Sequence, residues 1–170
     1  MKSIFVDGYN VINSWSELRE IKKYSLESAR GKLIETLQNY SGYNGYKLFI
    51  IFDAHLQIGS IEKKEKLTNN LVVVYTKEGQ TADEFIEKAI NIIGRKIEVC
   101  VVTSDSLEQQ VIFQRGATRM SSVEFYYEVM NIENKIRVQT EKDNLEKKNL
   151  LKELIKKEVF EKLEIIRRSQ

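Results

Sequence analysis

The sequence predicts an α/β fold of three layers, in which helices flank a central parallel sheet. Short apolar segments rich in strand formers recur along the chain, and amphipathic segments with capping residues lie between them. The 8 glycines fall mostly between these segments, and proline is absent, so glycine marks the boundaries. The apolar segments are nearly continuous in hydrophobicity, as expected of strands covered on both faces by helices. They span 3–6, 47–52, 71–75 and 97–102.

The predicted helices alternate with these strands. Two of them open with a capping box, in which Thr81 or Ser121 is followed three residues later by a glutamate. Gly42 and Gly94 are expected to end two of the helices. The order of elements predicts parallel strands joined by right-handed crossovers. The predicted helices span 25–40, 81–93, 106–115 and the residues that follow Ser121.

We expect the 170 residues to form one α/β domain at 1–135 and a C-terminal helix at 136–170. Residues 137–168 are dense in charge, contain no glycine and place apolar residues every three or four positions. This pattern predicts one long amphipathic helix. Its apolar stripe either packs on the domain, as such stripes usually do, or forms a surface for a partner.

Composition excludes several classes of protein. Basic and acidic residues number 27 and 25, and the surplus lies within 141–170, so a polyanion would have to be attracted by a local patch. No apolar run approaches the roughly 18 residues of a membrane span, and the N-terminal apolar stretch is too short for a signal peptide. We therefore expect a cytoplasmic protein that contacts no membrane. A single cysteine, Cys100, and a single histidine, His55, exclude an internal disulfide and most zinc sites.

Acidic side chains stand where the predicted strands end. Asp7, Asp53 and Asp105 each follow a strand, and Asp83 lies in the first turn of the helix after the third strand. Open parallel sheets bind ligands beyond the carboxyl ends of their strands, so we expect these four carboxylates to gather at one edge. Clustered carboxylates repel one another unless a cation neutralises them. Mg²⁺ or Mn²⁺, which prefers oxygen ligands, would suit this edge and predicts metal-assisted phosphoryl transfer.

Two of the acidic residues also have a simpler explanation. Asp83 would complement the helix dipole, and Asp105 would cap the helix that follows it. Asn10 either hydrogen-bonds Asp7 or a substrate, or only shapes the turn. Asp7 is harder to explain, because a charge at the edge of a hydrophobic sheet gains nothing without a partner. The recurrence of aspartates at strand ends therefore favours a shared site.

Four motifs, in order along the chain, carry a resemblance to a known family. They resemble those of the NYN domain family, which is PIN-like in fold, and in particular its bacterial YacP-like branch. The similarity runs from residue 3 to about residue 129 and includes GATRMS at 116–121. The four motifs are VDGYNVI at 6–12, FDAH at 52–55, YTKEGQTADE at 75–84 and VTSD at 102–105.

The resemblance implies a metal-dependent endoribonuclease. Asp7, Asp83 and Asp105 match the acidic metal-binding positions of the family, and we place Asp53 and Asn10 with them at the catalytic site. The implied cofactor is Mg²⁺ or Mn²⁺, without a nucleotide cofactor. The YacP-like branch is associated with ribosome-dependent cleavage of messenger RNA, which implies RNA and the ribosome as partners.

The family motifs assign no RNA contacts. Basic side chains near the predicted edge are candidates for binding phosphate, although each is equally explained as a solvated surface charge. A rival function is a non-catalytic, PIN-like module that binds RNA or the ribosome. The four aspartates favour the nuclease, because a module that only binds phosphate has no reason to collect negative charge. The candidate contacts are Arg30, Lys63, Lys64, Lys66, Lys77, Arg115 and Arg119.

Overall fold

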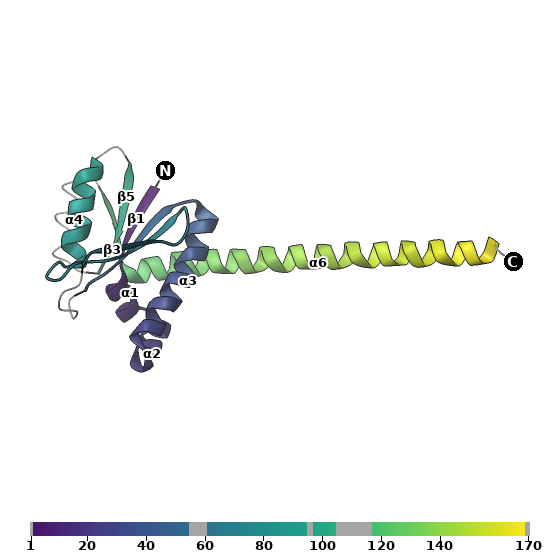
Figure 1. The fold of residues 1–170 in the computed structure, drawn as a ribbon, viewed down its shortest axis with the longest axis horizontal. Helices are drawn as coiled ribbons and strands as arrows, with labels where there is room; N and C mark the ends of the chain where they lie inside the picture. Colours follow the sequence, from purple (N-terminus) through teal and green to yellow (C-terminus); the bar gives the residue numbers. More distant parts are fainter. Residues whose placement is uncertain (1, 55–60, 95–96, 105–116, 169–170) are drawn as a thin grey trace. The chain divides into compact units, whose positions relative to one another are not determined.

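The computed structural model describes residues 2–54, 61–94, 97–104 and 117–168 (Figure 1). The chain divides into two compact units, Met1–Ile132 and Glu133–Gln170. The first unit contains the sheet and the candidate site, and the second consists of helix.

The first unit is built on a six-stranded sheet with the strand order β3-β4-β2-β1-β5-β6. Five strands run parallel, and β3 pairs with β4 in the antiparallel direction. Val6 of β1 lies beside Ile50 of β2 and Val102 of β5, so these three strands end at the same edge. The strands are β1 (Lys2–Asp7), β2 (Lys47–Phe52), β3 (Lys63–Lys66), β4 (Leu71–Tyr75), β5 (Glu98–Val102) and β6 (Thr118–Met120).

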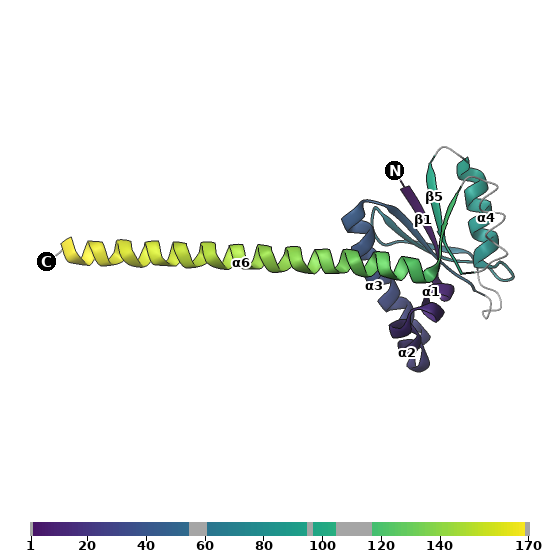
Figure 2. The same ribbon diagram turned by 180° about the vertical axis from the view of Figure 1, so that it is seen from behind.

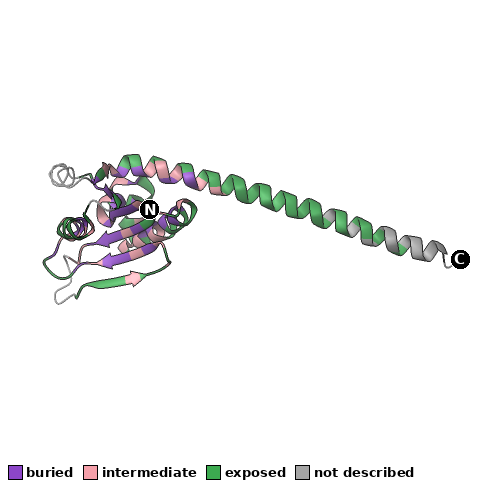
Figure 3. Cartoon of the chain, turned by 90° about the horizontal axis from the view of Figure 1, so that it is seen from above, coloured by how far each residue is buried: buried purple, intermediate pink, exposed green. Residues whose placement is uncertain are grey.

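Helices cover both faces of this sheet, with α4 on one face and α1 and α3 on the other (Figures 1 and 2). On the α4 face, Phe5, Ile51 and Val101 of the strands pack with Ile86 and Ile90 of the helix. Side chains alternate along a strand, so the sequence neighbours of these strand residues point to the opposite face. Figure 3 shows the central strands buried, which confirms the predicted three-layer α/β class. The helices are α1 (Gly8–Ser14), α2 (Ser16–Tyr24), α3 (Leu26–Asn44), α4 (Ala82–Ile93) and α6 (Ser122–Arg168).

Aromatic contacts fasten the first turns of α6 to the layer formed by α1–α3. The fully buried Tyr40 of α3 meets the Phe125 ring edge-on at 5.5 Å, and its hydroxyl donates to the Glu128 carboxylate. Burial, together with that carboxylate, raises the pKa of Tyr40 far above its usual range, so the phenol stays a donor. The Trp15 indole N–H donates to the Ser122 carbonyl at 2.8 Å. These contacts fix the start of α6 within the first unit.

The predicted capping box is complete at Ser121, and at Thr81 the bond to the capping hydroxyl is present. The Thr81 hydroxyl accepts from the Glu84 N–H at 3.2 Å, and α4 ends at Gly94 as predicted. At the start of α6, the Ser121 N–H donates to the Glu124 carboxylate at 2.7 Å, and the Glu124 N–H donates back to the Ser121 hydroxyl at 3.1 Å. Hydrogen bonding of the Glu124 carboxylate to the Ser121 side chain, and then to the Ser121 backbone N–H, lowers the pKa of Glu124 below its usual value, because both favour the ionised form.

Several element boundaries differ from the prediction. Gly42 does not end α3, which continues to Asn44 and stops at Gly45, where φ is 66°. A left-handed backbone suits glycine, so Gly45 and not Gly42 supplies the terminus. Residues 8–24, for which no element was predicted, form α1 and α2. The missed α1 has only 7 residues, too short for a clear apolar period.

The segment KKEK at 63–66, for which no strand was predicted, is the edge strand β3. Its charged composition hides a strand from sequence analysis, yet charged side chains are common on edge strands because they oppose further pairing. The two helices predicted after Ser121 are one continuous helix, α6, since neither glycine nor proline interrupts residues 117–168. The helix predicted at 106–115 lies outside the described residues.

The second unit continues α6 as a helix with an exposed surface. Leu145, Leu150 and Leu154 are each more than half exposed. Leu151 and Val159, which belong to the predicted apolar stripe, are also more than half exposed, and the side chains of Ile155 and Leu163 lie outside the described residues. The packing of the whole stripe stays a prediction. Within the described part of the chain, none of the helices combines the length and the apolar character of a membrane span.

Gly8, the first residue of α1, permits the closest backbone approach in the site region. A Cβ atom at this position would lie 2.3 Å from Cε1 of the buried Phe52 ring. That distance is far inside van der Waals contact, and in a close-packed interior the ring has little space into which to move.

We expect Gly8→Ala to destabilise the first unit by about 1–3 kcal/mol or more, since the extra methyl overpacks the Phe52 ring. The matched control is Gly31→Ala in α3, where a Cβ meets nothing within 4 Å. This control should be stabilising by roughly 0.5–1 kcal/mol, as expected for alanine in an exposed helix. Urea denaturation measures both free energies. Equal effects of the two substitutions would show that the Phe52 contact is not limiting, and Phe52→Leu should partly rescue Gly8→Ala.

Candidate active site at the carboxyl edge of the sheet

Asp7 ends the central strand β1 and caps α1. Its Oδ1 accepts from the Asn10 N–H at 2.9 Å, and the residue is partly buried. Because α1 begins at the next residue, the strand turns into helix without a connecting loop. The carboxylate is therefore held at the strand end by local backbone geometry.

Asn10 joins three segments that are distant in sequence. Its carboxamide oxygen accepts from the Ser122 hydroxyl at 2.6 Å and from the Ser104 N–H at 3.3 Å. The Ser104 hydroxyl donates to the Ser122 hydroxyl at 3.1 Å. These bonds tie the start of α1 to the segment after β5 and to the start of α6. Asn10 reaches Asp7 through its backbone N–H, so its interpretation as a turn-shaping residue has structural support, and its predicted contact with substrate stays a prediction.

Thr76 holds the chain on both sides of Asp53. Its N–H donates to the Phe52 carbonyl at 3.0 Å, and its hydroxyl accepts from the Ala54 N–H at 3.0 Å. The same hydroxyl donates to the Gln80 carbonyl at 2.7 Å. Thr76 is completely buried, so these bonds are shielded from water. This side chain therefore fixes Asp53 at the edge between β2 and β4.

The remaining acidic candidates are described only in part. Asp83 is partly buried in the first turn of α4, two residues after the capping Thr81. Asp105, like His55, lies outside the described residues. Among the residues that are described, no group of three or more His, Cys, Asp or Glu side chains is arranged to hold a metal. The predicted metal set includes Asp105, so it stays a prediction. Its donors are carboxylate oxygens, which suit Mg²⁺ or Mn²⁺ in kind.

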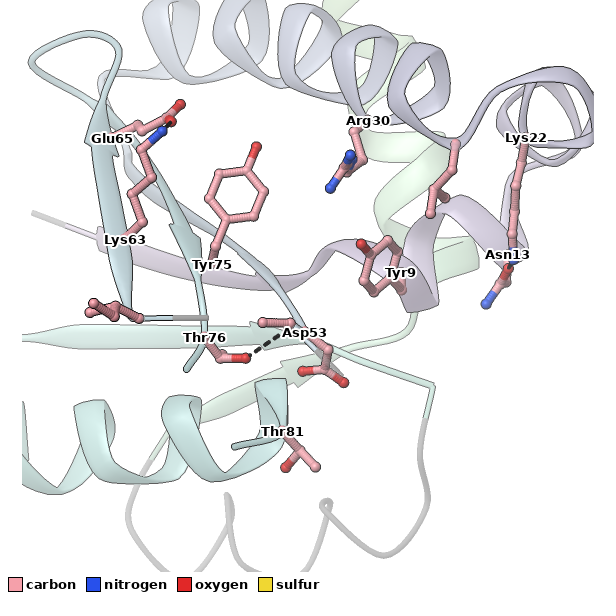
Figure 4. A pocket seen from close by; sticks show the side chains of 13 residues that line it. Tyr9, Asn13, Lys22, Arg30, Asp53, Lys63, Glu65, Tyr75, Thr76 and Thr81 are labelled. Carbon is pink, nitrogen blue, oxygen red and sulfur yellow. Dashed lines mark hydrogen bonds and ion pairs between the residues drawn. The ribbon is translucent and has the colours of Figure 1, made fainter. Parts of the chain in front are cut away.

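A pocket of about 980 Å³ opens beside Asp53 (Figure 4). Two lysines in its lining already contact other side chains, one a carboxylate and the other a neutral carboxamide. The Lys63 ammonium lies 2.5 Å from the Glu65 carboxylate, and this hydrogen bond raises the pKa of Lys63. The Lys22 ammonium donates to the Asn13 carboxamide at 2.6 Å. The charged residues of the lining are Lys22, Arg30, Asp53, Lys63 and Glu65.

Two tyrosines that the sequence analysis did not select also line this pocket. Tyr9 and Tyr75 both contact the Phe52 ring, with centroid distances of 5.2 Å and 5.7 Å. Tyr9 lies two residues after Asp7, and Tyr75 is the last residue of β4. Their position beside the strand-end aspartates is the signal that could have identified them.

Of the predicted RNA contacts, the structure brings only Arg30 and Lys63 to the pocket, among the residues it describes. Lys64 lies over the Phe85 ring of α4 at 5.4 Å and pairs with Glu62 at 2.8 Å. The Arg119 guanidinium donates to the Thr103 carbonyl at 3.4 Å, beyond the end of β5. Lys66 and Lys77 are exposed, and Arg115 lies outside the described residues.

Comparison with known proteins places this chain in a family. Residues 4–168 match the model of the YacP-like NYN domain. The chain is 44% identical over 151 residues to a Bacillus subtilis (strain 168) protein described as uncharacterized protein YacP, covering 86% of each.

Solved structures agree with this match. The crystal structure of Rae1 (YacP) from Bacillus subtilis superimposes with a TM-score of 0.75 at 38% identity, covering 99% of this chain and 95% of the other. A single-substitution mutant of the same Bacillus protein gives a TM-score of 0.71 at 36% identity, with coverage of 84% and 83%. The chain therefore belongs to the YacP-like NYN family, whose domain is of the PIN-like nuclease type.

Proposed function

We propose that this protein is a metal-dependent endoribonuclease that cleaves messenger RNA in association with the ribosome. The observation that carries the proposal is the placement of Asp7 and Asp53 at the ends of neighbouring strands, where Asp7 caps its own turn and Thr76, from the segment after β4, holds the residues on both sides of Asp53. Holding carboxylates together at one edge costs free energy unless a cation or a reaction uses them. A nuclease-type domain supplies such a use.

Asp7, Asp83 and Asp105 would hold Mg²⁺ or Mn²⁺, and the bound ion would activate a water and stabilise the charge on the phosphodiester. The chain's own residues position the substrate. Asn10 and Thr76 fix the turns that carry Asp7 and Asp53. Arg30, in the wall of the adjacent pocket, would attract the phosphate backbone.

The rival function is a PIN-like module that binds RNA or the ribosome without cleaving. It shares the fold and the basic side chains, so RNA binding alone does not separate the two functions. Cleavage that depends on the strand-end aspartates does separate them.

We expect Asp7→Asn, Asp83→Asn and Asp105→Asn each to reduce RNA cleavage to background while the fold is retained. Asparagine is as good a helix N-cap as aspartate, so Asp7→Asn should keep the start of α1. Relief of repulsion between carboxylates should leave the melting temperature without metal unchanged or raised for at least two of the three variants. Cleavage is measured by mapping RNA ends in a ribosome-containing translation reaction.

The matched control for these variants is Asp143→Asn, an exposed aspartate of α6 in the second unit. This substitution should leave cleavage unchanged. Full cleavage by the Asp7→Asn protein would remove the catalytic assignment and favour the binding module.

We expect Mg²⁺ or Mn²⁺ to raise the melting temperature, because a ligand that binds only the folded state stabilises it. At an ion concentration ten times Kd, the gain is about 1.4 kcal/mol. Differential scanning fluorimetry measures this shift, which Asp7→Asn should reduce. Zinc should not be required, since the donors are hard carboxylate oxygens. RNA cleavage that persists in excess chelator would contradict the metal requirement.

We expect the protein to co-sediment with ribosomes in a salt-dependent way, because residues 1–140 carry equal numbers of basic and acidic side chains and give little long-range attraction to RNA. The logarithm of the association constant should fall with the logarithm of salt by about 0.7–0.9 per phosphate contact. Charge reversal of Lys64 and Arg119 should weaken co-sedimentation without changing the stabilisation by metal. Lys88→Glu, an exposed reversal on α4, is the control.

Rapid cleavage of naked RNA with no increase in rate on adding ribosomes would contradict this expectation. It would mean that the edge and its pocket are sufficient, and that the ribosome is not a required partner.

A further inference from the structure

We propose that the pocket beside Asp53 is a nucleotide subsite, in which one base of a single-stranded RNA stacks between the Tyr75 ring and the Arg30 guanidinium. The identity of the ligand as RNA rests on the proposed function. The existence of a base-stacking subsite is tested separately from cleavage.

The Tyr9 and Tyr75 rings form an aromatic wall of the pocket, and the Phe52 ring beneath them holds them in place. The Phe52 ring is completely buried, and the Tyr75 ring stacks on it at 5.7 Å with an interplanar angle of 24°. Tyr9 rests on the same ring at 5.2 Å. A ring fixed before binding loses little rotamer freedom when a base stacks on it, so more of the stacking free energy appears as affinity.

The guanidinium of Arg30 already faces the Tyr75 ring. Its carbon atom lies 5.8 Å from the ring centroid, and Figure 4 shows the Arg30 side chain reaching toward the side of the pocket that holds the Tyr75 ring. A base placed between them at van der Waals distance needs a separation of roughly 7 Å, and displacing a long arginine side chain by about 1 Å satisfies this requirement without moving the backbone. Aromatic rings and guanidinium planes are the usual stacking partners of unpaired RNA bases.

The charges of the pocket favour one orientation of a bound nucleotide. Glu65 neutralises Lys63, which leaves Arg30 and Lys22 on the wall formed by α2 and α3. Asp53 stands at the strand edge and disfavours a phosphate there. A nucleotide would therefore point its base inward and keep its phosphates near Lys22. The Asp53 carboxylate offsets part of the positive charge of Arg30 and Lys22. Stacking, rather than phosphate attraction, therefore supplies most of the binding free energy of the nucleotide.

The Tyr75 phenol stays neutral in this setting. Burial, followed by the Glu65 carboxylate, raises its pKa above the usual value. A neutral phenol adds no repulsion toward phosphate and remains a hydrogen-bond donor at the rim. The volume of about 980 Å³ is at the upper end of ordinary ligand sites, roughly 300–1,000 Å³, and accommodates a nucleotide with part of its neighbour.

The test measures binding by fluorescence anisotropy of a labelled, short single-stranded RNA, with the wild-type protein in chelator at low salt, so that no cleavage occurs. The same strand with abasic residues serves as the second ligand. We expect Tyr75→Ala to weaken binding of the intact strand roughly 5- to 150-fold and that of the abasic strand little. Tyr75→Phe should bind as the wild type does. Tyr127→Ala, an exposed tyrosine of α6, is the matched control and should change nothing.

Arg30→Lys separates stacking from charge. It keeps the positive charge but loses the planar group, so affinity for the intact strand should fall while the salt dependence, about 0.7 per phosphate contact, is retained. This variant also keeps the proposal testable if Tyr75→Ala fails to fold, which a melting curve detects.

Three results would overturn the subsite. Intact and abasic strands could bind equally well, Tyr75→Ala and Arg30→Lys could leave the affinity for intact RNA unchanged, or AMP alone could bind as tightly as the strand, which would indicate a nucleotide-cofactor site. A base-dependent affinity in a protein that does not cleave RNA would support the subsite and contradict the nuclease. Cleavage without any base-dependent affinity would support the nuclease and contradict the subsite.

Discussion

The contact between the Gly8 backbone and the Phe52 ring sets the geometry on which the candidate site depends. Because Gly8 has no side chain, α1 begins directly after β1 and lies against the end of β2. Asp7 then serves as both strand end and helix cap. The Tyr9 and Tyr75 rings also pack against this Phe52 ring. One buried ring therefore couples the position of the central aspartate to the position of the pocket wall.

Two polar side chains complete this edge by joining segments that the sheet alone leaves separate. Thr76 bonds to the residues before and after Asp53, and Asn10 bonds to the segments after β5 and β6. Where such hydrogen bonds are shielded from water, as at the buried Thr76, they specify one arrangement, since each broken bond leaves a desolvated polar group. The edge is thus organised largely around side chains that carry no charge. The strand-end aspartates do not have to supply that organisation by themselves.

The sequence predicted the fold well where the pattern depends on burial. The bounds of β2 and β4 agree with the apolar segments. Strands covered on both faces are apolar at nearly every position, so the apolar run begins and ends with the strand. It failed where pairing or a single contact decides the structure. β3 is held by the backbone of β4, so its four charged residues carry no apolar signal. Asp7 and Asp53 were found because position after a strand is visible in sequence, whereas Tyr9 and Tyr75 converge only through Phe52, a tertiary contact.

The near-neutral charge of residues 1–140 constrains how such a site can recognise RNA. A site that relied on phosphate attraction would need an excess of cations around its aspartates, and the pocket instead pairs Lys63 with Glu65 and has Asp53 as well as Arg30 in its lining. Stacking on a fixed ring does not depend on net charge, so it is the interaction that remains effective beside the strand-end aspartates. It gives modest affinity with little preference among sequences. Under the proposed function, a large RNA-rich partner such as the ribosome would supply the remaining affinity, while the pocket selects unpaired nucleotides at the edge where Asp7 and Asp53 lie.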